Sequence, residues 1–224
     1  MNFKEKFQIE KEKLSKMKFK DKVGYIWEYY KYWIIGTIAG IILIYGIVDA
    51  QIENSKPTYL YLTLVNTNLM SSNETTLMDD FAAYAQLDLS DTRLNMDTSI
   101  QMDPEVSDEY SMNSSAKMFA QFASKTIDAT IMDKDMVNFF ADVDAFADLS
   151  EVLPADFYEA HKDNFITGTD SEGNKFICAI DISDSVIFQR TNAYQVTPYY
   201  SIVANTENLD NTIEFLQYLY SENK

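Results

Sequence analysis

The 224-residue sequence predicts an α/β domain attached to a single transmembrane helix. The 17-residue stretch Tyr32–Val48 carries no charge, and strand-like and helix-like segments alternate after it. The charge is also divided: residues 1–31 hold nine lysines against five acids, whereas residues 49–224 hold 30 acids against nine basic residues. We therefore expect one transmembrane helix followed by a single extracytoplasmic α/β lobe, in which helices flank a mostly parallel sheet.

The uncharged stretch has the length and flanks of a membrane helix. At about 1.5 Å per residue it spans roughly 26 Å, close to the ~30 Å hydrocarbon core of a bilayer. Aromatic and basic residues at one end are typical of the membrane interface. The expected interface residues are Trp27, Tyr30, Lys31 and Trp33. The predicted boundaries are a basic cytoplasmic juxtamembrane helix over 1–31, the transmembrane helix over 32–50, a linker over 51–57 and the domain over 58–224.

The division of charge predicts how the chain crosses the bilayer. Lysine-rich flanks stay in the cytoplasm, which leaves the domain outside a bacterial cell. Within residues 3–22, the lysines favour either a solvated helix or one lying on the anionic inner leaflet. Cleavage as a signal peptide near Val48–Ala50 is the alternative, but the 31 preceding residues make an uncleaved signal anchor the expectation. A domain of net charge −21 repels phosphates, so we expect no nucleic-acid partner.

The first half of the domain alternates strands with helices. Residues 58–65 are β-branched, aromatic or apolar throughout, which indicates a strand that is buried on both faces. Helix 111–125 is expected to bury one side that carries Met112, Ala116, Phe119 and Phe122 or Ala123. The predicted order is strand 58–65, helix 74–87, strand 93–102, helix 111–125, strand 127–132 and helix 136–143. This alternation indicates parallel strands joined by right-handed crossovers.

The second half follows a different pattern. Residues 165–167 and 175–180 flank a polar turn that contains Gly168 and Gly173, which predicts a β-hairpin. A strand over 199–204 and a closing helix over 208–221 complete the expected domain.

Four segments in this order resemble the extracytoplasmic solute-binding proteins of bacterial ABC importers, which have the type II periplasmic-binding fold. The segments are Asp128–Asp133, Asp148–Leu153, Lys175–Asp181 and Tyr200–Leu219. The resemblance implies an α/β fold that binds a ligand without chemistry. Family members carry two lobes around a cleft, but residues 190–199 are too few for a second lobe, so we expect a one-lobed relative in which a membrane helix replaces the lipid anchor.

Candidate ligand-binding residues follow the predicted strands. Open α/β sheets bind ligands at the carboxyl ends of their strands. These positions are Asn66, Thr67, Asp133, Asp181 and Ser183. Asn and Asp are also favoured as helix caps and turn formers, so capping is the alternative role. Tyr194 and Tyr199 are further candidates for lining a surface groove.

The sequence offers little for catalysis or metal binding. It lacks a nucleophile elbow, a His-Glu-x-x-His motif and a phosphate-binding glycine loop. The acidic runs that include Asp144 and Asp170 do not follow an EF-hand pattern. Cys178 lies in an apolar run and predicts a buried hydrophobe, whereas His161 is expected at the surface. We therefore expect no enzymatic activity and no cofactor.

Two functions remain open. The first is a single-pass membrane protein that displays a non-catalytic solute-binding-like module and binds a small solute or peptide. The second is a structural or assembly protein of the cell envelope, whose lobe docks another envelope membrane protein. In both hypotheses the lipid bilayer is a partner.

Overall fold

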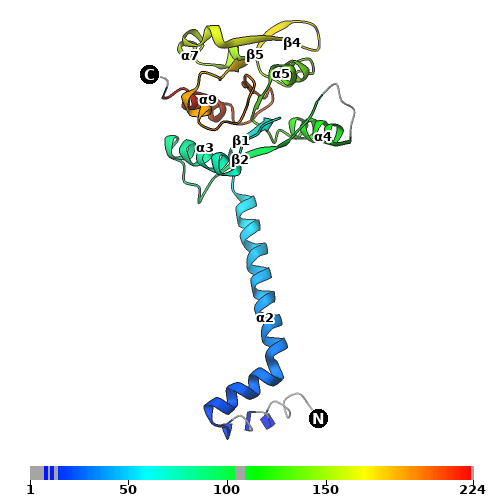
Figure 1. Ribbon diagram of the computed structural model, residues 1–224, viewed down its shortest axis with the longest axis vertical. Helices are drawn as coiled ribbons and strands as arrows, with labels where there is room; N and C mark the ends of the chain where they lie inside the picture. The colour runs from blue at the N-terminus through cyan, green and yellow to red at the C-terminus, as the bar shows by residue number, and fades with distance from the viewer. Residues whose placement is uncertain (1–7, 10, 13–14, 104–108, 223–224) are drawn as a thin grey trace. The chain divides into compact units, whose positions relative to one another are not determined.

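The computed structural model describes residues 8–222 apart from 10, 13–14 and 104–108 (Figure 1). The chain divides into two compact units, Met1–Ser55 and Lys56–Lys224. Much of the tail segment 3–22 lies outside the described residues, so the choice between a solvated and a membrane-lying helix stays a prediction.

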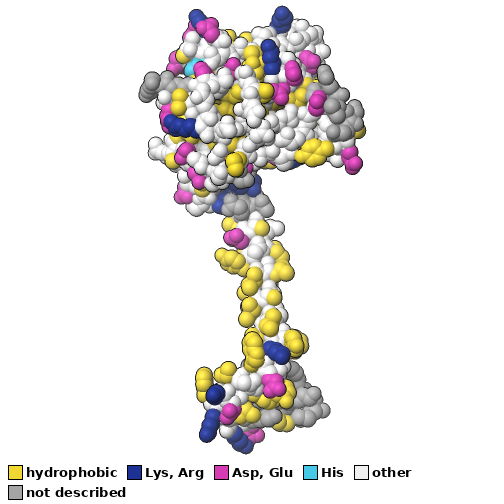
Figure 2. All heavy atoms as spheres, in the orientation of Figure 1, with side chains coloured by type: hydrophobic (Ala, Val, Ile, Leu, Met, Phe, Trp, Pro, Cys, Tyr) yellow, Lys and Arg dark blue, Asp and Glu magenta, His cyan; other side chains and the backbone are white. Residues whose placement is uncertain are grey.

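The first unit is dominated by helix α2 (Phe19–Ser55). Within it, Trp27–Ile52 is long and apolar enough to cross a membrane, and the described residues contain one such helix. Hydrophobic side chains line α2, with lysines and acids toward its amino-terminal end (Figure 2). The single candidate membrane helix is thus confirmed, but the linker predicted over 51–57 is wrong. No helix breaker precedes Pro57, so α2 continues to Ser55 and only Lys56 and Pro57 precede the first strand.

The second unit contains a six-stranded mixed sheet flanked by helices. Its strands are β1 (Thr58–Val65), β2 (Arg93–Ile100), β3 (Ala129–Met132), β4 (Phe165–Thr169), β5 (Lys175–Asp181) and β6 (Tyr199–Ile202). The spatial order is β2-β1-β3-β6-β5-β4. Its helices are α3 (Ser71–Tyr84), α4 (Glu109–Ala123), α5 (Lys134–Ala141), α6 (Leu149–Val152), α7 (Ala155–Ala160), η1 (Lys162–Asn164), α8 (Val186–Gln189) and α9 (Leu209–Leu219). The predicted α/β class and the β4–β5 hairpin are confirmed.

The expectation of a mostly parallel sheet is not confirmed. Strand β1 pairs in parallel with β2 and with β3, whereas the β3–β6, β6–β5 and β5–β4 pairs are antiparallel. Among these antiparallel pairs, β4 and β5 are joined by a short turn, the connection that antiparallel neighbours allow. Strand β6 reaches β5 only after α8, and it pairs with β3 from far along the chain, so tertiary packing sets its direction. A five-residue turn joins β4 to β5, and its Gly173 adopts a left-handed φ of +88°.

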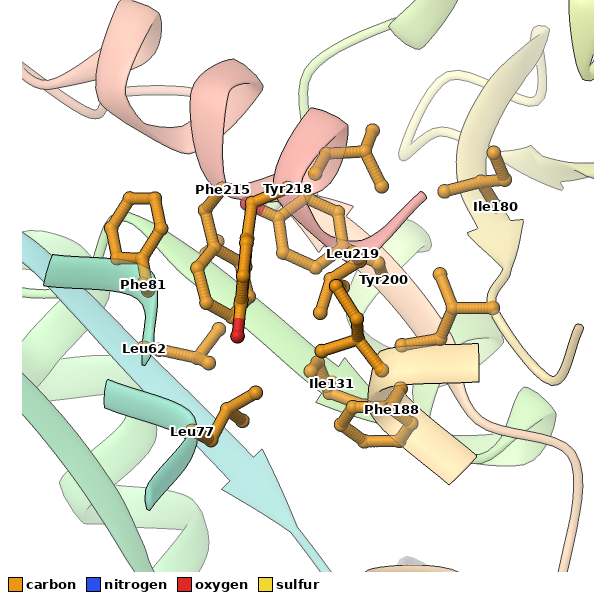
Figure 3. Packing of buried hydrophobic residues seen from close by; sticks show 14 of the residues in the cluster. Leu62, Leu77, Phe81, Ile131, Ile180, Phe188, Tyr200, Phe215, Tyr218 and Leu219 are labelled. Atoms are coloured by element: carbon orange, nitrogen blue, oxygen red, sulfur yellow. The ribbon is translucent and has the colours of Figure 1, made fainter. Parts of the chain in front are cut away.

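The sheet separates two hydrophobic clusters. Leu62 and Leu64 of β1 belong to one cluster, while Val65 of the same strand belongs to the other. This alternation buries both faces of β1, as its apolar sequence predicts. In the first cluster, Phe81 of α3 and Phe215 of α9 pack edge to face with ring centroids 4.9 Å apart (Figure 3). Burial of such aromatic side chains is a major stabilising term.

Helix α4 buries Phe122 as predicted, but the rest of its buried face differs from the predicted one. Met118 and Phe122, four residues apart, are buried in the second cluster, together with Ser111 and Ser114. Met112, expected in the core, is 63% exposed. The prediction failed because two small polar residues occupy the buried stripe, so apolar character alone gave the wrong rotation about the helix axis.

A row of buried hydroxyls crosses the centre of the sheet. Thr63 of β1 pairs in register with Thr130 of β3, which pairs with Ser201 of β6. All three residues are fully buried, and in the described part of the chain none of their hydroxyl oxygens has a hydrogen-bond partner. An unbonded buried hydroxyl costs free energy on folding.

This row predicts a stabilising substitution. Thr130→Val removes the unbonded hydroxyl with little change of shape, so we expect the free energy of unfolding to rise by about 1 kcal/mol. Thr212→Val is the matched control, because the buried Thr212 hydroxyl donates to the carbonyl of Leu209 over 2.6 Å and its loss should cost about 1 kcal/mol. Urea denaturation of the full chain in micelles, followed by near-UV circular dichroism, measures both. A loss of stability in Thr130→Val contradicts the account.

Candidate functional site

The topology brings the five predicted site residues to one edge of the sheet. Strands β1 and β3 are parallel, and β5 runs in the same direction because it is antiparallel to β6, which is antiparallel to β3. The carboxyl ends of all three strands therefore meet at this edge. In the order β2-β1-β3, the chain goes from β1 to β2 on one side of β1 and then returns to β3 on the other side. The boundary between β1 and β3 is therefore a topological switch point. We call the position beside Val65 and Ile131, near those strand ends, the strand-end site.

Asn66 joins the ends of two strands. Its backbone has a left-handed φ of +57°, a conformation that asparagine tolerates better than most residues. Its side-chain amide donates to the carbonyl of Met102 and its side-chain oxygen accepts from the amide of Met102, both over 2.8 Å. Both polar atoms of this side chain are thus bonded to the backbone that follows β2.

Thr67 and Asp133 also bond to backbone. The Thr67 hydroxyl donates to the carbonyl of Ala193 over 3.0 Å and accepts from the amide of Leu69. Asp133 is the N-cap of α5, where its carboxylate accepts from the amides of Asp135 and Met136, both over 3.0 Å. The capping alternative therefore describes what these two side chains do.

At the end of β5, Asp181 forms a turn with Ser183, and His161 packs nearby against Tyr220. The Asp181 carboxylate accepts from the amide of Ser183 over 2.8 Å, while its carbonyl accepts from the hydroxyl of Tyr220. His161 lies against Tyr220, with ring centroids 4.2 Å apart, and is only partly exposed. His161 thus lies at the surface as expected, with its ring packed against Tyr220. Burial lowers the pKa of His161, which Asp184 partly opposes, so the imidazole is favoured in its neutral form.

Tyr194 fills the strand-end site. Its hydroxyl lies 2.7 Å from the carbonyl oxygens of both Val65 and Ile131 and donates its one proton between them. Burial raises the pKa of this phenol well above its usual range. The sequence predicted a groove-lining role for Tyr194 but gave no sign of this contact, because the partners are main-chain atoms more than 60 residues away.

Two hollows lie near this edge. One has a volume of about 300 Å³ and is lined by Ser183 and Tyr194, but by none of the other four predicted site residues. The second, of about 500 Å³, lies between α3, α8 and the end of α9, and we call it the α3–α9 groove. Its lining includes Asn73, Asp80, Tyr84, Arg190, Tyr218 and Glu222. No sequence pattern marked this groove, because its walls come from three helices far apart in the chain.

Among the described residues, neither the cysteine nor the groups of metal-ligating side chains form a reactive site. Cys178 is fully buried, as predicted, and burial raises the pKa of its thiol to about 11, which keeps it protonated. Over residues 8–222, less those left undescribed, no group of three or more His, Cys, Asp or Glu side chains is arranged to hold a metal ion.

The Tyr194 contact predicts a specific loss of stability. Tyr194→Phe leaves the carbonyls of Val65 and Ile131 without this donor, so the free energy of unfolding should fall by about 1–2 kcal/mol. Tyr199→Phe is the control, because the Tyr199 hydroxyl has no hydrogen bond to any described residue, and its effect should stay within about 0.5 kcal/mol. Urea denaturation of both variants checks this, and equal effects would contradict it.

Comparison with known proteins adds no assignment. No family model matches the chain, and neither a curated protein nor a solved structure does. The resemblance to solute-binding proteins therefore remains a prediction, and the functional argument depends on the geometry of the chain itself.

Proposed function

We propose that this chain is a single-pass membrane protein of the bacterial envelope whose α/β domain docks a partner protein without chemistry. One observation carries the proposal: the hydroxyl of Tyr194 occupies the strand-end site, where a solute would bind in a fold of this class. A domain that fills its own ligand position is better suited to present a surface than to enclose a solute.

The polar groups around the strand-end site support the same conclusion. The side chains of Asn66, Thr67 and Asp133 are bonded to backbone atoms. A solute would have to replace these bonds as well as the Tyr194 contact, and each unpaired buried group would cost about 1–3 kcal/mol. Asp181 makes a similar bond within its own turn, to the amide of Ser183.

The orientation belongs to the proposal and is argued from charge. The tail over residues 1–31 has a net charge of +4, which favours the cytoplasmic side, and the domain of charge −21 then lies outside. The same negative charge favours a partner with a basic surface, because complementary potentials speed association and exclude like-charged proteins.

Binding of a small solute or peptide is the second candidate. The observation that favours it is the α3–α9 groove, whose volume of about 500 Å³ falls in the range of ligand pockets. In this version the chain keeps a binding function but places it at the groove instead of at the strand-end site.

Photo-crosslinking in cells tests docking directly. A photoreactive phenylalanine replaces Tyr84, Tyr110 or Val196 in the full chain, three side chains that are at least 44% exposed. Docking predicts a discrete heavier adduct from at least one position, reproducible between cultures. Recovery of only the monomer from all three positions would contradict docking. A rise in melting temperature of the purified chain with a small solute, in the absence of any adduct, would favour the second candidate instead.

A further inference from the structure

The α3–α9 groove carries an acid, Asp80, that attracts the charge of Arg190 without forming an ion pair with it. Asp80 lines the groove from α3, and within the described part of the chain its carboxylate makes no hydrogen bond or ion pair. Across the groove, Arg190 donates from one guanidinium nitrogen to Glu222 over 3.1 Å and from a second nitrogen to the other carboxylate oxygen. The Arg190–Glu222 pair is neutral, so Asp80 leaves the groove with one net negative charge.

Tyr218 provides an unused hydroxyl in the same groove. Only 5% of this residue is exposed, and it forms part of the groove lining. Its ring packs against Phe81 and Phe215 in the first cluster (Figure 3), while its hydroxyl bonds to no described residue. The hydroxyl oxygen itself reaches the surface of the groove, where water or a ligand can bond to it. The nearby charges of Asp80 and Glu222 contribute to raising the pKa of Tyr218 to about 12, after burial itself.

The aromatic wall of the groove suits a cation. The rings of Tyr84 and Tyr218 lie 5.3 Å apart, and Tyr84 is 44% exposed at the groove surface. Tyrosine faces attract ammonium and guanidinium groups by about 0.5–1 kcal/mol at exposed sites. Arg190 shows that a guanidinium already fits among these residues.

From the unpaired acid, the unused phenol and the paired tyrosine rings, we infer that the α3–α9 groove binds a lysine or arginine side chain from an extended segment of a partner protein. This inference depends on the proposed docking function and names the chemistry of the partner. The charge of −21 on residues 49–224 draws basic segments toward the domain, and Asp80 gives one of their cations a defined position.

Peptide binding to the full chain tests this inference. The chain is placed in nanodiscs of neutral phosphatidylcholine at about 150 mM salt, where exposed charges are screened beyond ~8 Å. The probe is a fluorescein-labelled, acetylated peptide of alternating glycine and lysine, and the comparison peptide carries glutamine in place of lysine. Fluorescence anisotropy should show binding of the lysine peptide and at least tenfold weaker binding of the glutamine peptide.

Two neighbouring acids on α3 give a matched pair of variants. Asp80→Asn should weaken binding of the lysine peptide about tenfold, because a charge-assisted hydrogen bond is lost. Asp79→Asn removes the same charge from the preceding residue of the same helix, which is also exposed but does not line the groove, and it should change affinity less than twofold. Asp80→Glu should retain binding, and the melting temperature of each variant shows that it is folded.

Four results would overturn the inference. Equal losses in Asp79→Asn and Asp80→Asn would show binding to the general acidic field, and similar affinity for both peptides would show that no cation is recognised. Competition by butylamine at concentrations close to those of the peptide would assign the groove to free amines. If the unaltered chain forms the crosslinked adduct in cells but does not bind the lysine peptide, docking stands and the groove inference fails. Absence of any adduct counts against docking itself.

Discussion

The carbonyl groups at the carboxyl ends of β1 and β3 must find hydrogen-bond donors, and much of the domain depends on how they do so. Both strands are buried on both faces, so little water reaches their ends. The chain meets this constraint far along its sequence with Tyr194, whose hydroxyl lies 2.7 Å from the carbonyl oxygens of Val65 and Ile131. The constraint that usually creates a ligand site in an open α/β sheet is therefore satisfied internally.

Much of the fold was predictable from the sequence because it depends on local pattern. The charge-free run, the apolar β1 and the turn between β4 and β5 are all visible in neighbouring residues, and the structure contains each of them. The direction of β6 was not predictable in this way. Strand polarity depends on which neighbour a strand finds, and nothing within Tyr199–Ile202 specifies an antiparallel partner.

The candidate site was predictable only in part. Strand-end positions could be read from element order, and the sheet brings them to one edge as expected. The residue that occupies that edge could not be predicted from the sequence. The Tyr194 hydroxyl bonds to main-chain carbonyls, which leave no sequence signal, and the residues around Tyr194 resemble an ordinary loop. The face of α4 was mispredicted for a related reason: Ser111 and Ser114 are buried where apolar residues were expected. The α3–α9 groove left no sequence signal, because tertiary packing alone brings Asp80 and Tyr218 together.

The central claim is that the Tyr194 ring fills a position that another molecule could otherwise occupy. Tyr194→Gly would empty that position, and p-cresol has the size and hydroxyl of the missing side chain. Thermal unfolding of the full chain with and without p-cresol tests this most directly, because a ligand that binds only the folded state raises the melting temperature. The account predicts a rise for Tyr194→Gly and none for the unaltered chain. A folded Tyr194→Gly variant that p-cresol does not stabilise, or an equal rise in both proteins, would contradict it.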